Sequence, residues 1–270
     1  AATLALFAST ALSAQTAPTA PAAASTQASE DARLTQFLDA EFAAYVKTQP
    51  QLATRLGIKD GGDKWSDISD AAADAQVAWR QASVARMKAQ FDRARLSPEG
   101  QVNYDIWALE ADRAALSNKN RVYRPPFYSR LYSAHSQLPD FLINTHSVTD
   151  ATDLNNYIAR LRGMPAVLDL ALARTKASEQ AGIRAPKFQI ETIIATSEKL
   201  TSGAPFGPGP DAALWADVKA KTAALVSAGK LGQADADLLL GQAKDAILAL
   251  KPAYGRVIDW AKGNLATAPS

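Results

Sequence analysis

The sequence contains two histidines, His135 and His146, and these are the first residues to consider for metal chemistry. A hydrolytic zinc site needs two or three histidine or carboxylate ligands and a general base, typically as H-E-x-x-H on one helix. Neither histidine is followed by glutamate, and their separation, with Pro139 between them, does not place both on one helical face. The pair therefore predicts no metal site and no catalytic residue. We expect each histidine to end a helix or to support a neighbouring residue.

Other common catalytic chemistries also lack their residues. The sequence has no cysteine, which excludes a thiolate nucleophile and a thiolate metal site, and it has no G-x-S-x-G motif for a serine nucleophile. No glycine-rich loop follows a strand-like segment, so nucleotide use is not indicated. The 29 basic and 27 acidic residues are spread without runs, which argues against a nucleic-acid partner. We therefore expect these 270 residues to bind no cofactor.

A polar stripe near the middle of the chain is the strongest candidate for specific side-chain interactions. Asp153 and Tyr157 are four residues apart and Tyr157 and Arg160 three apart, so their side chains can lie along one face of a helix. An apolar stripe runs beside them, formed by Leu154, Ile158 and Leu161. A buried carboxylate and a buried guanidinium must be satisfied by partners, and a tyrosine hydroxyl can serve either. We predict that Asp153, Tyr157 and Arg160 form a structural polar network.

A long segment between predicted helices, residues 117–134, is the candidate for substrate contact. Pro125 and Pro126 prevent a helix there, so we predict a long, proline-containing central loop. Aromatic faces and guanidinium forks suit an extended peptide and its carboxylate. The loop residues of these types are Tyr123, Tyr128, Tyr132, Arg121, Arg124 and Arg130. The alternative is ordinary packing of a loop over helices. Across the chain, the candidate substrate-binding residues are Tyr128, Arg130, His135 and Arg160.

The beginning of the chain differs in composition from the rest. Residues 1–14 form a short apolar run that ends in small residues, as in a secretory signal peptide, but they lack a starting methionine and a positively charged beginning. We therefore expect a truncated signal peptide and a periplasmic or secreted protein. Residues 15–28 offer little to bury, which predicts a disordered linker. No later stretch stays apolar for about 18 residues, so we expect no membrane span.

Helical spacing of apolar residues recurs through residues 29–270, and no segment alternates as a β-strand does. We therefore predict an all-α fold built as a multi-helix array of antiparallel helices. Prolines should interrupt two of the helices: Pro165 should break or kink the helix with the polar stripe, and Pro252 should kink a long C-terminal helix. A helix from about residue 98 to 116 is expected to face the core with Val102, Ile106 and Leu109.

Several short motifs resemble those of one bacterial family. The matching residues are Leu138, Pro139, Asp153, Tyr157, Arg160, Leu161 and Pro165. This pattern resembles the family known as domain of unknown function 885, whose members are mostly secreted or periplasmic and look like zinc metallopeptidases. The resemblance implies that residues 29–270 are the helical, non-catalytic N-terminal region of a larger peptidase-like domain. It also implies a zinc ion and a histidine-glutamate motif in a C-terminal half that these residues do not include.

Two functions are compatible with the sequence. In the first, the chain is the N-terminal helical half of an exported zinc-dependent metallopeptidase; it forms part of the peptide-substrate cleft and is inactive on its own. In the second, it is a complete periplasmic helical protein that binds a peptide or a partner and has no catalytic role. The codons after Ser270 in the gene distinguish the two. A reading frame that continues into a histidine-glutamate motif favours the peptidase, and a stop codon favours the binding protein.

Overall fold

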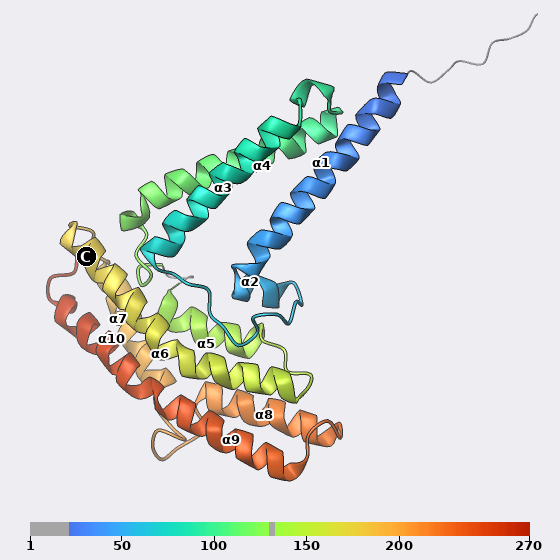
Figure 1. Ribbon diagram of the computed structural model, residues 1–270. Helices are drawn as coiled ribbons and strands as arrows, with labels where there is room; N and C mark the ends of the chain where they lie inside the picture. The colour runs from blue at the N-terminus through green and yellow to red at the C-terminus, as the bar shows by residue number, and fades with distance from the viewer. Residues whose placement is uncertain (1–21, 130–132) are drawn as a thin grey trace, which may run out of the picture.

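Helices make up most of the described chain. A computed structural model describes residues 22–129 and 133–270 (Figure 1). These residues contain no β-strand, so the predicted all-α fold is confirmed. Within the same ranges, no helix combines the length and the apolar character that a membrane span requires. The helices are α1 Ala22–Lys47, α2 Pro50–Arg55, α3 Asp70–Gln90, η1 Arg93–Arg95, α4 Pro98–Lys119, η2 Arg121–Tyr123, α5 Ala134–Asn144, α6 Ala151–Gln180, α7 Lys187–Leu200, α8 Ala213–Ser227, α9 Gln233–Leu248 and α10 Leu250–Leu265.

The helices form two groups, each with its own hydrophobic core. Helices α1, α3 and α4 lie together at one end of the molecule, and α5 to α10 form a larger block at the other (Figure 1). The first core is built from Leu34, Val84, Met87, Phe91, Leu96, Tyr104 and Ala111. The second core joins buried residues of α5 to α10. A groove at the junction between the two groups therefore leaves both hydrophobic cores intact.

Helix α6 is the central element of the larger block. It contacts α5, α8, α9 and α10, and it also contacts η2, which follows the N-terminal group. Its start is fixed by Asp150, whose side chain accepts a hydrogen bond of 2.9 Å from the backbone N–H of Asp153. The carboxylate of Asp153 lies in the first turn, where the helix dipole favours negative charge. Helix α6 therefore presents the polar stripe from a well-defined position inside the block.

Prolines act differently from the prediction at two places. The predicted meeting of two helices near Met164 is wrong, because helix α6 continues through Pro165: Met164 and Leu168 beside it are buried and hold the helix against its neighbours despite the missing N–H. Pro252 lies in the first turn of α10, where a proline removes no intrahelical hydrogen bond. The chain is divided at Ala249 into α9 and α10, so the single kinked helix expected there is replaced by two helices.

The apolar face of α4 was assigned to the wrong side. Val102, Ile106 and Leu109 are 54%, 52% and 46% exposed, whereas the prediction turned them toward the core. Helix α4 instead buries Tyr104 and Ala111 against the first core. Both faces of this helix carry apolar residues at helical spacing, so periodicity alone cannot choose between them. The larger aromatic side chain decides the orientation, because it buries more apolar surface.

The first helix begins earlier than its sequence suggested. Helix α1 starts at Ala22, so residues 22–28 are helical, although their composition had placed them in a linker. Alanine has the highest intrinsic helix propensity, and three alanines open this segment. The predicted signal peptide, residues 1–14, and the first part of the predicted linker lie outside the described residues.

Candidate functional site

The three residues of the polar stripe share one buried face of α6, but each has a different partner. Asp153 accepts hydrogen bonds from Lys59 Nζ (2.9 Å) and from the hydroxyl of Thr149 (2.6 Å). Hydrogen bonding to Thr149 and Lys59 outweighs burial and holds the pKa of the Asp153 carboxyl below its ordinary value. Tyr157 donates its hydroxyl to Asp217 Oδ2 on α8 at 2.8 Å. The stripe therefore connects α6 to the loop after α2 and to α8.

Arg160 is fully buried and binds backbone and neutral acceptors. Its Nε donates to the carbonyl of Lys64 at 2.9 Å, and its Nη2 donates to Thr54 Oγ1 at 2.8 Å and to the carbonyl of Pro50 at 3.3 Å. Its Nη1 donates to His146 Nδ1 at 2.9 Å. A planar guanidinium can reach several acceptors in fixed directions at once. Arg160 thus fastens the segment from Pro50 to Lys64 onto α6.

The charge of Arg160 is held among aromatic rings. Its guanidinium carbon lies 5.0 Å from the ring centroid of Phe141 and 5.8 Å from that of Trp65. No carboxylate of the described residues forms an ion pair with it, and burial lowers its pKa to about 10. Cation–π contacts and hydrogen bonds to carbonyls, together with the charge of Asp63 nearby, therefore compensate the buried charge.

His146 connects the three stripe residues. Because a guanidinium can only donate, His146 Nδ1 must accept from Arg160, and Nε2 then donates to the backbone carbonyl of Asp153 at 3.2 Å. Its ring packs edge-on against Tyr157, with centroids 5.5 Å apart. Burial and the nearby Arg160 lower the pKa of His146 to about 4, so the imidazole is neutral at pH 7. The sequence indicated a supporting role for His146 only indirectly, because no partner for a metal site accompanies it.

The three candidate substrate-binding residues that the structure describes, Tyr128, His135 and Arg160, are not gathered at one open site. His135 is buried, and its Nδ1 lies 2.8 Å from Ser133 Oγ. Tyr128 is half-buried, its hydroxyl donates toward Glu179 Oε1 at 3.1 Å, and burial raises its pKa. Arg160 is enclosed as described above, and Arg130 lies outside the described residues. An open site must therefore be built from other residues.

The described residues do not fit a zinc site. Both ring nitrogens of His146 are committed to hydrogen bonds, and His135 Nδ1 is committed to Ser133. In residues 22–129 and 133–270, no three histidine or carboxylate side chains converge on one point where they could bind a metal ion. No catalytic step through a metal is therefore assigned to these side chains.

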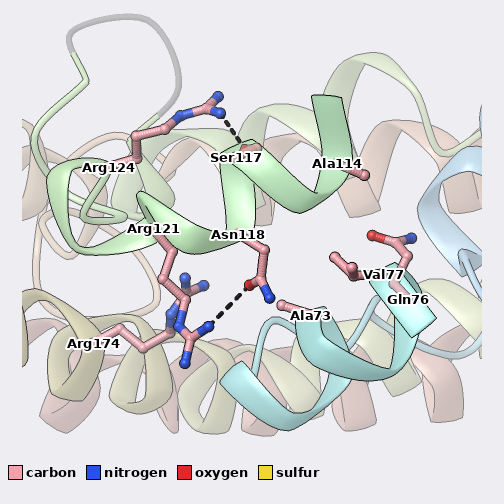
Figure 2. Close-up of a pocket in the computed structure, with 9 residues that line it drawn as sticks. All are labelled: Ala73, Gln76, Val77, Ala114, Ser117, Asn118, Arg121, Arg124 and Arg174. Atoms are coloured by element: carbon pink, nitrogen blue, oxygen red, sulfur yellow. Dashed lines mark hydrogen bonds between the residues drawn. The ribbon is translucent and has the colours of Figure 1, made fainter. Parts of the chain in front are cut away.

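An open groove lies between the two helical groups. Its central pocket, of about 320 Å³, is enclosed by α3, α4, η2 and α6 (Figure 2). The pocket is lined by Ala73, Gln76, Val77, Ala114, Ser117, Asn118, Arg121, Arg124 and Arg174. Figure 2 shows the guanidinium groups of Arg121 and Arg174 side by side. We call this pocket and its two neighbours the arginine groove.

The two neighbouring pockets extend the groove in different directions. One, of about 300 Å³, shares Arg121 and Arg174 with the central pocket and continues along the loop to Pro125 and Pro126. The other, of about 450 Å³, shares Arg174 and Gln76 with the central pocket and continues to the aromatic residues Tyr45 and Trp79. Arg174 lines all three pockets and is therefore at the centre of the groove.

The arginine end of the groove contains one guanidinium that has no carboxylate partner. Asp70 Oδ1 lies 3.4 Å from Arg121 Nε and 3.2 Å from Arg174 Nε, and Asp74 Oδ1 lies 3.0 Å from Arg121 Nη1. Arg124 donates to the hydroxyl of Ser117 at 2.7 Å and meets no carboxylate within the described ranges. Arg121 and Arg174 are thus paired with carboxylates, whereas Arg124, whose guanidinium points away from theirs toward Ser117 in Figure 2, is not. A further carboxylate, Asp67, lines the aromatic pocket. A guanidinium without a carboxylate partner suits a carboxylate ligand, which arginine binds through two parallel hydrogen bonds.

The sequence identified part of the groove. Arg121 and Arg124 were recognised because they lie in a proline-containing segment with tyrosines. Arg174 was missed, because it stands on α6, more than one helix away in the chain, and only the packing of η2 against α6 brings it to Arg121. No spacing rule within one element could have found this pair.

The fold and the groove define an all-α protein with two helical groups and an arginine-lined groove between them. Residues 50–270 match the family described as bacterial protein of unknown function (DUF885), and the chain belongs to this family. The match begins at the first residue of α2 and includes the arginines of the groove and the whole polar stripe. A search of curated proteins found no match.

Proposed function

We propose that this chain is the N-terminal helical half of an exported, zinc-dependent peptidase, in which it forms part of the substrate cleft and supplies no catalytic residue. The resemblance of the stripe residues to a peptidase-like family supports the reaction class. The arginine groove is the observation that supports a substrate-binding role for this chain. It is open, it is lined by arginines and aromatic residues, and it lies between two helical groups, as a wall of a peptide-binding cleft requires.

The groove suits a peptide better than the other partners considered. Its arginines provide forked donors for a carboxylate, and its aromatic end provides apolar surface. A nucleic acid would require a wider basic surface than three arginines balanced by Asp70 and Asp74. Export is part of the proposal and is supported by the apolar run of residues 1–14.

Zinc is part of the proposal only because the proposed reaction is zinc-dependent peptide hydrolysis. Its ligands would belong to a part of the enzyme that these 270 residues do not contain. We therefore expect that stoichiometric zinc does not co-purify with the tag-free chain and that the chain hydrolyses no peptide, because the side chains described here offer no set of zinc ligands. Metal analysis by mass spectrometry and a peptide-mixture digestion assay test this. One zinc ion per chain, or hydrolysis that a chelator stops, would contradict the proposal that the zinc ligands lie outside these residues.

The alternative, a periplasmic binding protein without catalytic activity, would use the same groove. The complete natural protein separates the two functions. Peptide hydrolysis by that protein supports the peptidase, whereas peptide binding without hydrolysis supports the binding protein.

A further inference from the structure

The arginine groove has two chemically different ends that one ligand can reach together. Gln76 and Trp79 are three residues apart on α3, which is one helical turn, or about 5 Å along the helix. Gln76 and Arg174 line both the central pocket and the aromatic pocket, and Trp79 lines the aromatic pocket. The two pockets therefore adjoin at these residues. One or two residues of extended peptide, at about 3.3 Å each, cover the step from Gln76 to Trp79, so a short chain end can extend from one pocket into the other.

The aromatic end is ordered by its own contacts. The rings of Tyr45 and Trp79 are stacked, with centroids 5.7 Å apart, and the guanidinium of Arg80 lies 4.6 Å from the centroid of Tyr45. Trp107 packs edge-on against Trp79, and its indole N–H donates to Ser83 Oγ at 3.0 Å. These contacts hold the Trp79 ring in place at the wall of the pocket, so a ligand side chain meets a fixed apolar surface.

We infer that the arginine groove binds the free C-terminus of a peptide, with its α-carboxylate at the arginines and a large apolar side chain from its last two residues against Tyr45 and Trp79. This inference rests on the proposed function, since it specifies which part of a peptide the groove takes. The guanidinium of Arg124, which has no carboxylate partner, favours a carboxylate over a neutral amide. The α-carboxylate is attached directly to the peptide backbone, unlike the carboxylate of an Asp or Glu side chain. It therefore stays close to the arginines while the neighbouring side chain occupies the aromatic pocket.

The test measures binding of fluorescein-labelled pentapeptides to the 270-residue chain by fluorescence anisotropy. Each peptide begins with three alanines and ends in Phe-Phe or Gly-Gly, as a free acid or as an amide; a fifth peptide ends in Phe-Glu amide. We expect the Phe-Phe acid to bind about tenfold more tightly than its amide, the loss typical of one charge-assisted contact. We also expect it to bind more tightly than the Gly-Gly acid and the Phe-Glu amide.

Two substitutions in the groove and two matched controls locate the site. Arg124→Gln removes the guanidinium without a carboxylate partner, and Gln76→Glu adds a negative charge to the wall that the central and aromatic pockets share without changing side-chain size. Both should weaken the acid peptide about tenfold, by a single charge contact, and leave the amide unchanged. Arg113→Gln on the exposed side of α4 and Gln81→Glu, also on α3, make the same chemical changes outside the groove and should have no effect.

Each contrary result removes a different claim. Equal binding of the Phe-Phe acid and the Phe-Phe amide would overturn the inference, although the groove would still bind peptides. A Phe-Glu amide that binds as tightly as the Phe-Phe acid would overturn it too, because a side-chain carboxylate would then serve as well as the C-terminal one. Equal binding of Phe-Phe and Gly-Gly acids would remove the aromatic pocket from the account. If none of the five peptides binds, the proposed function of this chain fails together with the inference.

Discussion

Replacing Arg160 with alanine is expected to lower the free energy of unfolding by about 3–5 kcal/mol, the range for losing a buried group that satisfies several others. The substitution leaves the carbonyl of Lys64, the hydroxyl of Thr54 and His146 Nδ1 without their donor. It also leaves a cavity beside Phe141. Because Arg160 fastens the segment after α2 onto α6, this segment should loosen before the rest of the fold. Urea denaturation measures the loss.

Arg124→Ala is the matched control for this substitution. Arg124 is exposed and has one described hydrogen bond, to Ser117, so its removal should change the free energy of unfolding by less than about 0.5 kcal/mol, as for most surface substitutions. The two variants should therefore differ: Arg160→Ala loses stability, whereas Arg124→Ala keeps its stability and binds the acid peptide more weakly. If Arg160→Ala keeps wild-type stability and abolishes the activity of the complete protein, the stripe belongs to the substrate site.

Acidification from pH 6.5 to pH 4 is expected to destabilise the fold strongly, through its two histidines. Burial lowers the pKa of both His135 and His146 from the ordinary 6.5 to about 4. Below pH 6.5 the unfolded chain therefore takes up protons that the folded chain refuses, so the free energy of unfolding falls with pH until about pH 4. Each histidine can contribute roughly 3 kcal/mol, at 1.36 kcal/mol for each pKa unit. The stability they provide is complete above pH 6.5.

Glutamine variants test the origin of this pH dependence. His146→Gln keeps an acceptor for Arg160 and a donor for the carbonyl of Asp153 but does not titrate. His135→Gln removes the other titrating group. Urea denaturation of the double variant between pH 7.5 and pH 4 should show most of the slope gone. Asp150 and Asp153, whose pKa values lie below 3.8, act mainly below this window. An unchanged slope would show that other groups cause the acid sensitivity.

Much of the fold was readable from the sequence, because helix formation is controlled by local patterns. Periodicity, together with the absence of alternation, indicated the all-α class, and the polar stripe does share one buried face of α6. The orientation of α4 was not readable, since Val102 and Tyr104 both lie on apolar faces and the packing of α3 decides between them. Pro165 misled for the same reason: local chemistry disfavours a helix there, and tertiary packing maintains it.

The candidate site was less predictable than the fold. Sequence spacing suggested that Asp153, Tyr157 and Arg160 interact, but it could not show that His146 joins them or that their polar partners lie on α8 and in the segment after α2. The groove depends on residues from α3, η2 and α6 meeting in space. Such contacts between distant elements leave no periodic signal in a single sequence.

The most direct test of the account is to map where a peptide binds. A pentapeptide acid ending in p-benzoylphenylalanine is bound to the 270-residue chain, irradiated, and the cross-linked residues are identified by mass spectrometry. The account predicts cross-links to the part of α3 between Ala72 and Trp79 and to the end of α1 near Tyr45, competed by the unlabelled Phe-Phe acid. Cross-links confined to α8 or α9, or cross-linking that the acid does not compete, would contradict a substrate-binding role for the arginine groove.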